Sequence, residues 1–481
     1  MATYHVSVLQ APPTRGEERA DTRSAGPARR YAHPIRSWLA AQLEERRPRG
    51  AVASLDGVRA CACLTVIAYH ISLMTRDQHL WTDTSNRLVG AILLAGGAGV
   101  TLFFVLSGFL LFLPYAQALL AEQPWPSARL FYLRRALRII PGYYFSLVVL
   151  VLLDHPEYLE PQRWGQLALF PIFLMDSTRA TFQQLNGPYW TLAIEWQFYL
   201  LLPLLALGII AMTRLLARWV RPEQRFWVVV GCLLGMCGWG LFTRYWGAYY
   251  SAHPAATFLV PHGMLNVVLF FTYGTDGKFL EDFAVGMLAG LTYTYLRAPG
   301  VSDQLRLRVR RLSLWLWAGG LGLLLFMAMQ HYSLTFQYSW PLLPTLFNLP
   351  GWLHELGFSL GFGLCILAIL GGPSWVRALF AWTPLRWIGL ISYSLYIWHL
   401  PLLYAFLYHI GPSLTPLPDA VAYSLYWVWT AVLVIPFSGV LYVLVERSGM
   451  RLSDRLRSQI VARRSQREPT VVLALQREGL A

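Results

Sequence analysis

Two side chains that can do chemistry, Arg59 and His70, lie eleven residues apart in an apolar stretch that runs from Leu55 to Met74. In an α-helix, eleven residues make three turns plus about 20°, so both side chains point the same way, about 16 Å apart along the axis. A neutral histidine acts as a general base when it reaches a proton that it can accept near its working pH. A snorkelling arginine and a hydrogen-bonded core histidine would give the same pattern, so the pair is a candidate site.

Two further arginines, Arg135 and Arg138, stand three residues apart in "FYLRRALRIIPGYY" and share a helical face. Guanidinium groups bind phosphate oxygens through paired hydrogen bonds, so this spacing suits a diphosphate. On the cytoplasmic face, the diphosphate-bearing ligands would be nucleotides and coenzyme A. Arginines that only fix the membrane topology are the alternative interpretation.

A carboxylate, Glu195, lies within "NGPYWTLAIEWQFYLLLPLL" and shares a helical face with Thr191 and Tyr199. A charged group inside a membrane is costly unless it has a partner. Counted from the ends of their segments, Glu195 and His70 lie at the same depth within error. We therefore predict that Glu195 hydrogen-bonds His70 directly or through one water. An ion pair that only holds helices together is the alternative.

A second histidine, His399, is the rival partner for His70, because it lies at a similar depth in "ISYSLYIWHLPLL". Ser392, Tyr396 and His399 fall on one helical face, since they follow the spacing of successive turns. A packed polar patch beside an interfacial aromatic ring would explain the same three residues.

The elements that must position these side chains are membrane-spanning helices. The chain has 481 residues, of which 56% are hydrophobic and 13% are charged, and soluble proteins carry about twice that charged fraction. Small residues in the second apolar run, Gly99 and Gly108, favour close helix contact. The apolar runs predict an all-α, polytopic bundle with about ten spans, at residues 57–75, 89–113, 139–154, 189–212, 226–247, 279–297, 313–330, 356–372, 386–410 and 421–445.

The net charge of +14 comes almost entirely from arginine, and its distribution indicates membrane topology rather than nucleic-acid binding. The arginine clusters all fall on one side when ten spans are counted, which predicts that both termini are cytoplasmic. We expect a disordered basic arm (1–53), a transmembrane domain (54–447) and a basic tail (448–481). The apolar piece Leu167–Met175 is too short to span and is expected to be re-entrant or interfacial.

Taken together, these stretches resemble the acyltransferase-3 family of integral membrane acyltransferases, from about Ser54 to Arg447. The family pattern of a basic residue, ten intervening residues and a histidine matches Arg59 and His70, and its paired arginines match Arg135 and Arg138. "FFVLSGFLL" resembles its second-helix signature, "WTLAIEWQFYLLLPLL" its Trp–Glu–Phe–Tyr block and "SYSLYIWHLPL" its Tyr–His–Pro block. "LYVLVERS" resembles the closing segment, although a serine replaces the usual proline there.

The resemblance implies the transfer of an acyl group, commonly acetyl, from cytoplasmic acyl-coenzyme A to a hydroxyl of a glycan or another acceptor. It makes His70 the essential catalytic residue and assigns the donor to the arginines. Glu195 would orient His70 or stabilise its imidazolium, as a carboxylate does in a catalytic triad. The remaining candidates, for contacts with the substrate or with the catalytic residues, are Trp190, Tyr199, Tyr396 and His399.

Other features limit the possible functions. All five cysteines lie in apolar runs without metal-site spacing, so we expect free thiols and no metal. A multi-span transporter or channel with a polar midplane site is the alternative class, and it would not consume acetyl-coenzyme A. The expected setting is a bacterial plasma membrane, with membrane lipids and a glycan, lipid-linked saccharide or metabolite as partners. The acceptor, the acyl chain length, the oligomeric state and an acyl-histidine intermediate stay open.

Overall fold

The computed structural model describes residues 53–77, 87–120, 123–216, 224–253, 274, 277–298, 300–338, 340, 349–414 and 416–460. The expected arm and residues 461–481 of the tail lie outside this part of the chain. Its secondary structure is helical, without a β-strand among these residues, so the all-α prediction is confirmed. The longer helices are α2 (Ala53–Asp77), α3 (Arg87–Leu94), α4 (Gly99–Leu120), α5 (Ala128–Leu153), α7 (Tyr189–Leu215), α8 (Arg225–Ala252), α10 (Leu280–Arg297), α11 (Asp303–Phe336), α12 (Gly351–Gly371), α14 (Thr383–Leu390), α15 (Ser392–His409), α16 (Asp419–Trp429) and α17 (Ile435–Leu441).

Eight helices of the described chain are long and apolar enough to cross a membrane, and a ninth span results if α14 and α15, bent by 75°, are taken together. These nine coincide with nine of the ten predicted spans, and the chain is a multi-pass membrane protein. The tenth predicted span forms α10, which carries Glu281, Asp282 and Arg297 within 18 residues. These three charged side chains make α10 more polar than the nine spans that are apolar enough to cross a membrane.

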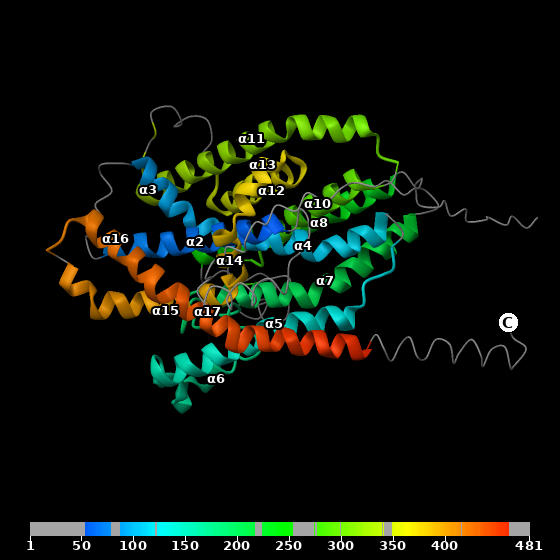
Figure 1. Ribbon diagram of the computed structural model, residues 1–481. Helices are drawn as coiled ribbons and strands as arrows, with labels where there is room; N and C mark the ends of the chain where they lie inside the picture. The colour runs from blue at the N-terminus through cyan, green and yellow to red at the C-terminus, as the bar shows by residue number, and fades with distance from the viewer. Residues whose placement is uncertain are drawn as a thin grey trace, which may run out of the picture. The chain divides into compact units, whose positions relative to one another are not determined.

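Glycines allow the central helices to approach closely, as their sequence predicts. A Cβ atom at Gly99 of α4 would lie 2.4 Å from the carbonyl oxygen of Ala62 on α2. A Cβ atom at Gly108 would lie 2.2 Å from the carbonyl oxygen of Phe283 on α10. Because larger side chains would push these backbones apart, the small residues place α2, α4 and α10 side by side in the bundle (Figure 1).

The connection between α5 and α7 folds back onto the bundle instead of forming a soluble loop. It contains short helical turns, including α6 (Trp164–Leu167), and then a run of turns in which Phe170 and Phe173 are buried. The hydroxyl of Tyr143 on α5 donates to the carbonyl of Phe170 at 2.9 Å, and Gln197 Nε2 on α7 donates to the carbonyl of Phe173 at 2.7 Å. This returning segment fixes where α7 begins.

Candidate active site

The two histidines of the predicted site meet between α2 and α15. His70 Nδ1 lies 3.1 Å from His399 Nε2, and the other ring nitrogen of His399, Nδ1, lies 2.8 Å from the carbonyl oxygen of Tyr396. His399 is fully buried. The rival partner in the sequence, His399, is therefore the residue that contacts His70.

The hydrogen bonds of His399 determine where the protons lie in the neutral pair. A carbonyl only accepts, so His399 Nδ1 carries the proton that it donates to Tyr396. In neutral His399, Nε2 is then an acceptor, and His70 Nδ1 must be the donor toward it. Neutral His70 consequently keeps its Nε2 unprotonated. That nitrogen is the one that can accept a proton from a substrate.

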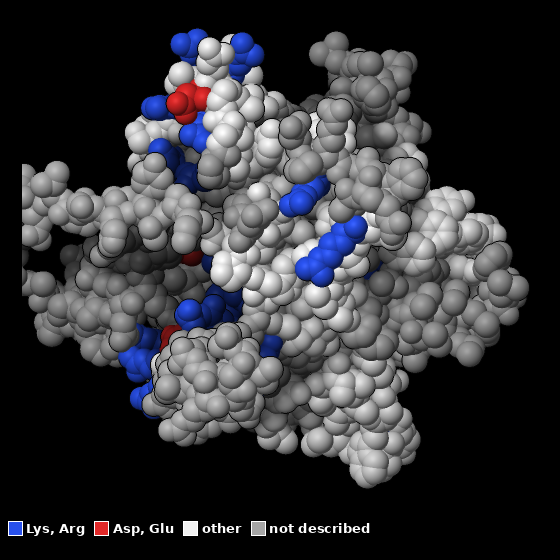
Figure 2. Space-filling view, turned by 90° about the vertical axis from the view of Figure 1, so that its right-hand side faces the viewer, with Lys and Arg blue, Asp and Glu red and all other residues white. Residues whose placement is uncertain are grey.

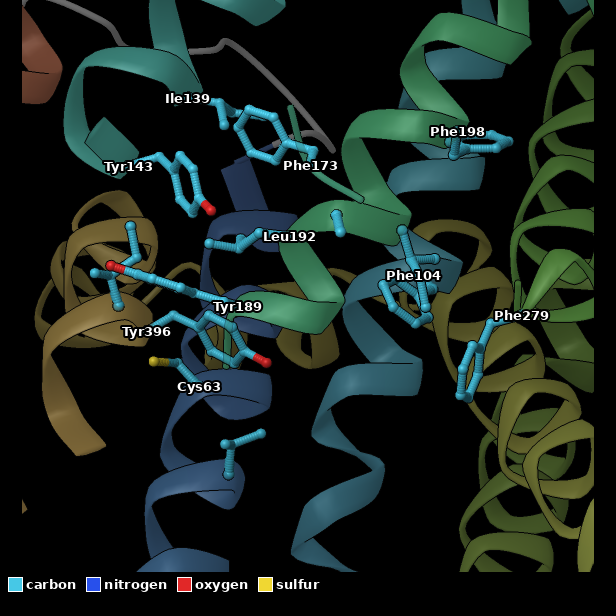
Figure 3. Packing of buried hydrophobic residues seen from close by; sticks show 14 of the residues in the cluster. Cys63, Phe104, Ile139, Tyr143, Phe173, Tyr189, Leu192, Phe198, Phe279 and Tyr396 are labelled. Carbon is cyan, nitrogen blue, oxygen red and sulfur yellow. The ribbon is translucent and has the colours of Figure 1, made fainter. Parts of the chain in front are cut away.

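Helices α2 and α15 run parallel beside each other, which sets the register of the histidine pair. Cys63 Sγ on α2 lies 3.8 Å from the carbonyl oxygen of Ser392 on α15, and the two histidines lie seven residues further along each helix. Figure 3 shows Cys63, Tyr189 and Tyr396 close together between α2, α7 and α15. The parallel register therefore brings His70 into contact with His399, which lies 329 positions further along the chain.

Glu195 has other partners than the predicted one. Its Oε1 accepts a hydrogen bond of 2.5 Å from Ser107 Oγ on α4, and it also accepts from the hydroxyl of Tyr199, one turn further along α7. A direct hydrogen bond between Glu195 and His70 is not formed. The predicted direct contact is therefore not observed, and an effect of Glu195 on His70 through one water stays a prediction.

Glu195 and His70 lie at different levels of the bundle because α7 begins among packed helices close to the level of the histidines. Tyr189, its first residue, is fully buried, and Asn186 just before it donates through Nδ2 to the carbonyl of Ile397 at 3.0 Å. Thr191 Oγ1 lies 2.9 Å from the hydroxyl of Tyr396. Glu195 follows Thr191 by one turn, about 6 Å further from the level of the histidines.

The predicted donor arginines gather around Glu195 instead. Arg59, Arg135 and Arg138 each lie close enough to Glu195 and Tyr199 to interact electrostatically with both. The guanidinium carbon of Arg135 lies 5.7 Å from the centre of the Tyr199 ring. Three helices, α2, α5 and α7, thus bring the arginine pair, the arginine of the first motif and the carboxylate to one place, which we call the arginine group.

Two buried carboxylates that the sequence interpretation missed complete the arginine group. Asp56 Oδ1 lies 3.3 Å from Arg59, and Glu446 Oε1 lies 4.0 Å from Arg138 Nε. Glu446 Oε2 also accepts a hydrogen bond from Ser394 at 3.1 Å. Asp56 and Glu446 each lie one residue outside a predicted span, close in the sequence to an arginine, and this proximity was the signal available for both of them.

The arginine group has an unused binding capacity. Arg135 Nε is buried and has no hydrogen-bond partner among the residues that the structure describes. A buried donor of this kind costs free energy unless a ligand accepts from it. Figure 2 shows basic side chains lining a hollow in the face that carries the beginning of α5 and the end of α4. Arg135 Nε can therefore donate a hydrogen bond to an acceptor oxygen of a ligand.

The aromatic candidates divide between two places. Tyr396 lies beside the histidines, where its ring also contacts Phe103 at 5.6 Å between centroids, and Tyr199 lies in the arginine group. Trp190 instead packs against Phe279, 5.3 Å away, at the side of α7 that faces the beginning of α10. In Figure 3, Phe279 and Tyr396 lie on opposite sides of α7, so Trp190 does not join the histidine pair.

Among the residues that the structure describes, no group of three or more His, Cys, Asp or Glu side chains is arranged to hold a metal ion. All five cysteines are described and none forms a disulfide, as their sequence positions predict.

The described chain is a bundle of apolar spans that holds a histidine pair and, nearer the start of α2, an arginine group. The family model described as an acyltransferase domain matches residues 52–443, and the chain belongs to this family. The resemblance that the motifs indicate is therefore confirmed.

Two named relatives are similar along most of the chain. The peptidoglycan O-acetyltransferase OatA of Listeria monocytogenes is 28% identical over 379 residues, which cover 74% of this chain and 50% of the relative. The O-acetyltransferase OatA of Staphylococcus aureus is 26% identical over 393 residues, covering 75% of this chain and 52% of the relative. The chain thus spans about half the length of these curated relatives. No solved structure matches it significantly.

Proposed function

We propose that this protein transfers an acetyl group from acetyl-coenzyme A on the cytoplasmic side to a hydroxyl of a cell-envelope glycan, in the plasma membrane of a bacterium. The observation that carries the proposal is that His70, whose Nε2 is left unprotonated by its contact with His399, lies on the same helix, α2, as Arg59 of the arginine group. The family membership and the names of the two relatives support acetyl as the group and a glycan as the acceptor.

The arginine group would bind the donor through its diphosphate. Arg135 and Arg138 offer planar donors that match two phosphate oxygens each, and the unpartnered Arg135 Nε would gain an acceptor. Arg59 lies about 16 Å from His70 along α2, because eleven residues separate them. The flexible pantetheine arm of coenzyme A would cover this interval and carry the thioester to the histidines.

His70 would act as the general base at the thioester. The acceptor hydroxyl gives its proton to His70 Nε2 while its oxygen bonds to the thioester carbonyl carbon, and the carbon–sulfur bond then breaks. The proton on His70 passes to the leaving coenzyme A sulfur, so that the imidazole returns to its neutral state. Burial of His399 and partial burial of His70 would limit the access of water and so the hydrolysis of the thioester. An acyl-histidine intermediate would use the same nitrogen.

His399 and Glu195 would have separate supporting roles. His399 accepts from His70 Nδ1 and thereby holds the tautomer that leaves Nε2 free to accept a proton. Glu195 would hold Tyr199 and the arginines in place for the donor, since its contacts lie in the arginine group. Neutral His399 would stabilise a protonated His70 less than a carboxylate would. The activity of His70 as a base would therefore depend chiefly on its position and its tautomer.

The test uses a variant in which His70 is replaced. The full chain is reconstituted in lipid nanodiscs, and isotopically labelled acetyl-coenzyme A is supplied as the donor. His70→Ala should lower the rate of acetyl transfer by about 10²–10⁴-fold, the usual contribution of a general base. His409→Ala, at the exposed end of α15, is the matched control and should transfer at the wild-type rate.

Mass spectrometry of surface glycans from cells that express each variant identifies the acceptor. A His70→Ala protein that inserts normally and keeps more than about a tenth of the wild-type rate contradicts the assignment. A wild-type protein that moves a solute across the membrane without consuming acetyl-coenzyme A would make it a transporter instead.

A further inference from the structure

A second group of arginines surrounds a cavity away from the arginine group of the candidate site. The cavity has a volume of about 530 Å³ and lies between the end of α10, the beginning of α11 and the connection from α12 to α13 (Ser374–Phe380). Its charged lining consists of Arg297, Arg306, Arg310 and Arg377. Figure 2 shows basic side chains gathered near the beginning of α11, apart from the hollow with the donor arginines. None of Arg59, Arg135 and Arg138 lines this cavity.

The charges of this cavity are not balanced by the protein. Arg306 is held by Asp303 at 3.2 Å and by the carbonyl of Leu296 at 3.0 Å, so it is already occupied. Arg310 and Arg377 make no ion pair within the described chain, and no acidic side chain lines the cavity. Several arginines that converge on a cavity without carboxylates favour an anion with several oxygens, such as a phosphate group.

Apolar side chains beside the cavity indicate where the anion comes from. Trp375 and Leu379, two residues on either side of Arg377, are each 53% exposed, and Trp315 on α11 is 77% exposed. Tryptophan side chains of membrane proteins concentrate at the level of the lipid headgroups. Basic cavities between helices at the cytoplasmic side are suited to acidic lipid headgroups.

We propose that this cavity binds the phosphate headgroup of an anionic membrane phospholipid. Arg310 and Arg377 contact the phosphate oxygens, Arg297 borders the headgroup from its position over the ring of Tyr293, and the acyl chains lie along the exposed face of α13 and α11. The site is independent of the proposed acetyl transfer, because it uses none of the residues assigned to the donor or the base. Its occupant would anchor the cytoplasmic ends of α10, α11 and α12 to one another.

The experiment measures which lipids stay bound to the full-length protein. The wild type and the Arg310→Gln/Arg377→Gln variant are reconstituted with an equal mixture of phosphatidylglycerol and phosphatidylcholine, and the lipids retained after detergent extraction are identified by native mass spectrometry. The variant should lose phosphatidylglycerol affinity by about fivefold for each arginine removed. Arg455→Gln/Arg457→Gln is the control, since it removes the same charge from exposed positions outside the cavity.

Four results are possible, three from comparing the variants and one from adding soluble phosphates to the wild type, and each of them decides the proposal. Loss of phosphatidylglycerol in the cavity variant alone supports it. Equal retention by both variants, or an equal loss in both, overturns it, because the binding would then not depend on the cavity. Displacement of the lipid from the wild type by adenosine 3′,5′-bisphosphate, but not by inorganic phosphate, also overturns it and assigns the cavity to a soluble nucleotide.

Discussion

The two ends of the candidate site are built on different principles. At the histidine end, His70 and His399 are neutral groups in one hydrogen-bond chain that ends on a backbone carbonyl. At the arginine end, several cations are held among buried carboxylates, of which Asp56 and Glu446 are the nearest. The first arrangement fixes a tautomer and the second fixes positions of charge. We therefore expect changes at the two ends to affect different kinetic constants.

The arginine end should give the largest change in donor affinity. Arg135→Gln/Arg138→Gln is expected to raise the KM for acetyl-coenzyme A by about 10²-fold or more, because each lost charge-assisted hydrogen bond is worth about 1.5–3 kcal/mol. The lysine pair should also bind weakly, since a point charge does not reproduce the guanidinium fork. Initial rates over a range of donor concentrations measure this. An unchanged KM would reduce both arginines to topology signals.

Substitutions at the histidine end should lower kcat rather than raise the KM for the donor. His399→Leu removes the acceptor for His70 Nδ1, so His70 can adopt either tautomer, and we expect kcat to fall by about tenfold or more, as is typical for a residue that orients another. The KM for the donor should stay within about twofold, since the arginines are unchanged. His399→Gln, which offers an acceptor in a similar place, should recover part of the rate. A variant that changes only KM would place His399 with the donor.

A substitution of Glu195 tests whether this carboxylate serves the arginine end or the histidine end of the candidate site. Glu195→Gln should raise the donor KM several-fold, because Tyr199 and the nearby arginines lose a charged partner worth about 1 kcal/mol or more. The shape of the pH–rate profile should not change, because Glu195 does not contact His70. A shift of the acid limb in this variant would instead restore the predicted coupling of Glu195 to the base.

Glu446 offers the smallest and most specific change. Its carboxylate lies 4.0 Å from Arg138, so Glu446→Gln keeps the acceptor for Ser394 and removes only the charge. The donor KM should rise about two- to fivefold, in line with a partly solvated ion pair. Glu157→Gln, in the exposed connection after α5, is the control and should have no effect. A fall in kcat alone would show that Glu446 acts beyond positioning Arg138.

Much of the fold follows from local patterns. Apolar runs predict nine of the spans, and α10 differs because Glu281 and Asp282 begin it. Face sharing by Thr191, Glu195 and Tyr199 is a property of one helix, and the Glu195–Tyr199 contact confirms it. The site was predicted less completely, because residues on one helix face do not reveal which neighbouring helix they meet.

The amino-acid sequence by itself determined nine of the membrane spans, the family and the residue types of the candidate site. Only the tertiary structure decided the partners. It paired His70 with His399 because α2 and α15 run parallel in register, and it moved Glu195 to the arginines because the segment before α7 returns into the bundle. The physical reason is that hydropathy and helical periodicity act over a few turns of chain. The depth at which a helix begins, and the helix that it faces, depend on packing between segments hundreds of residues apart.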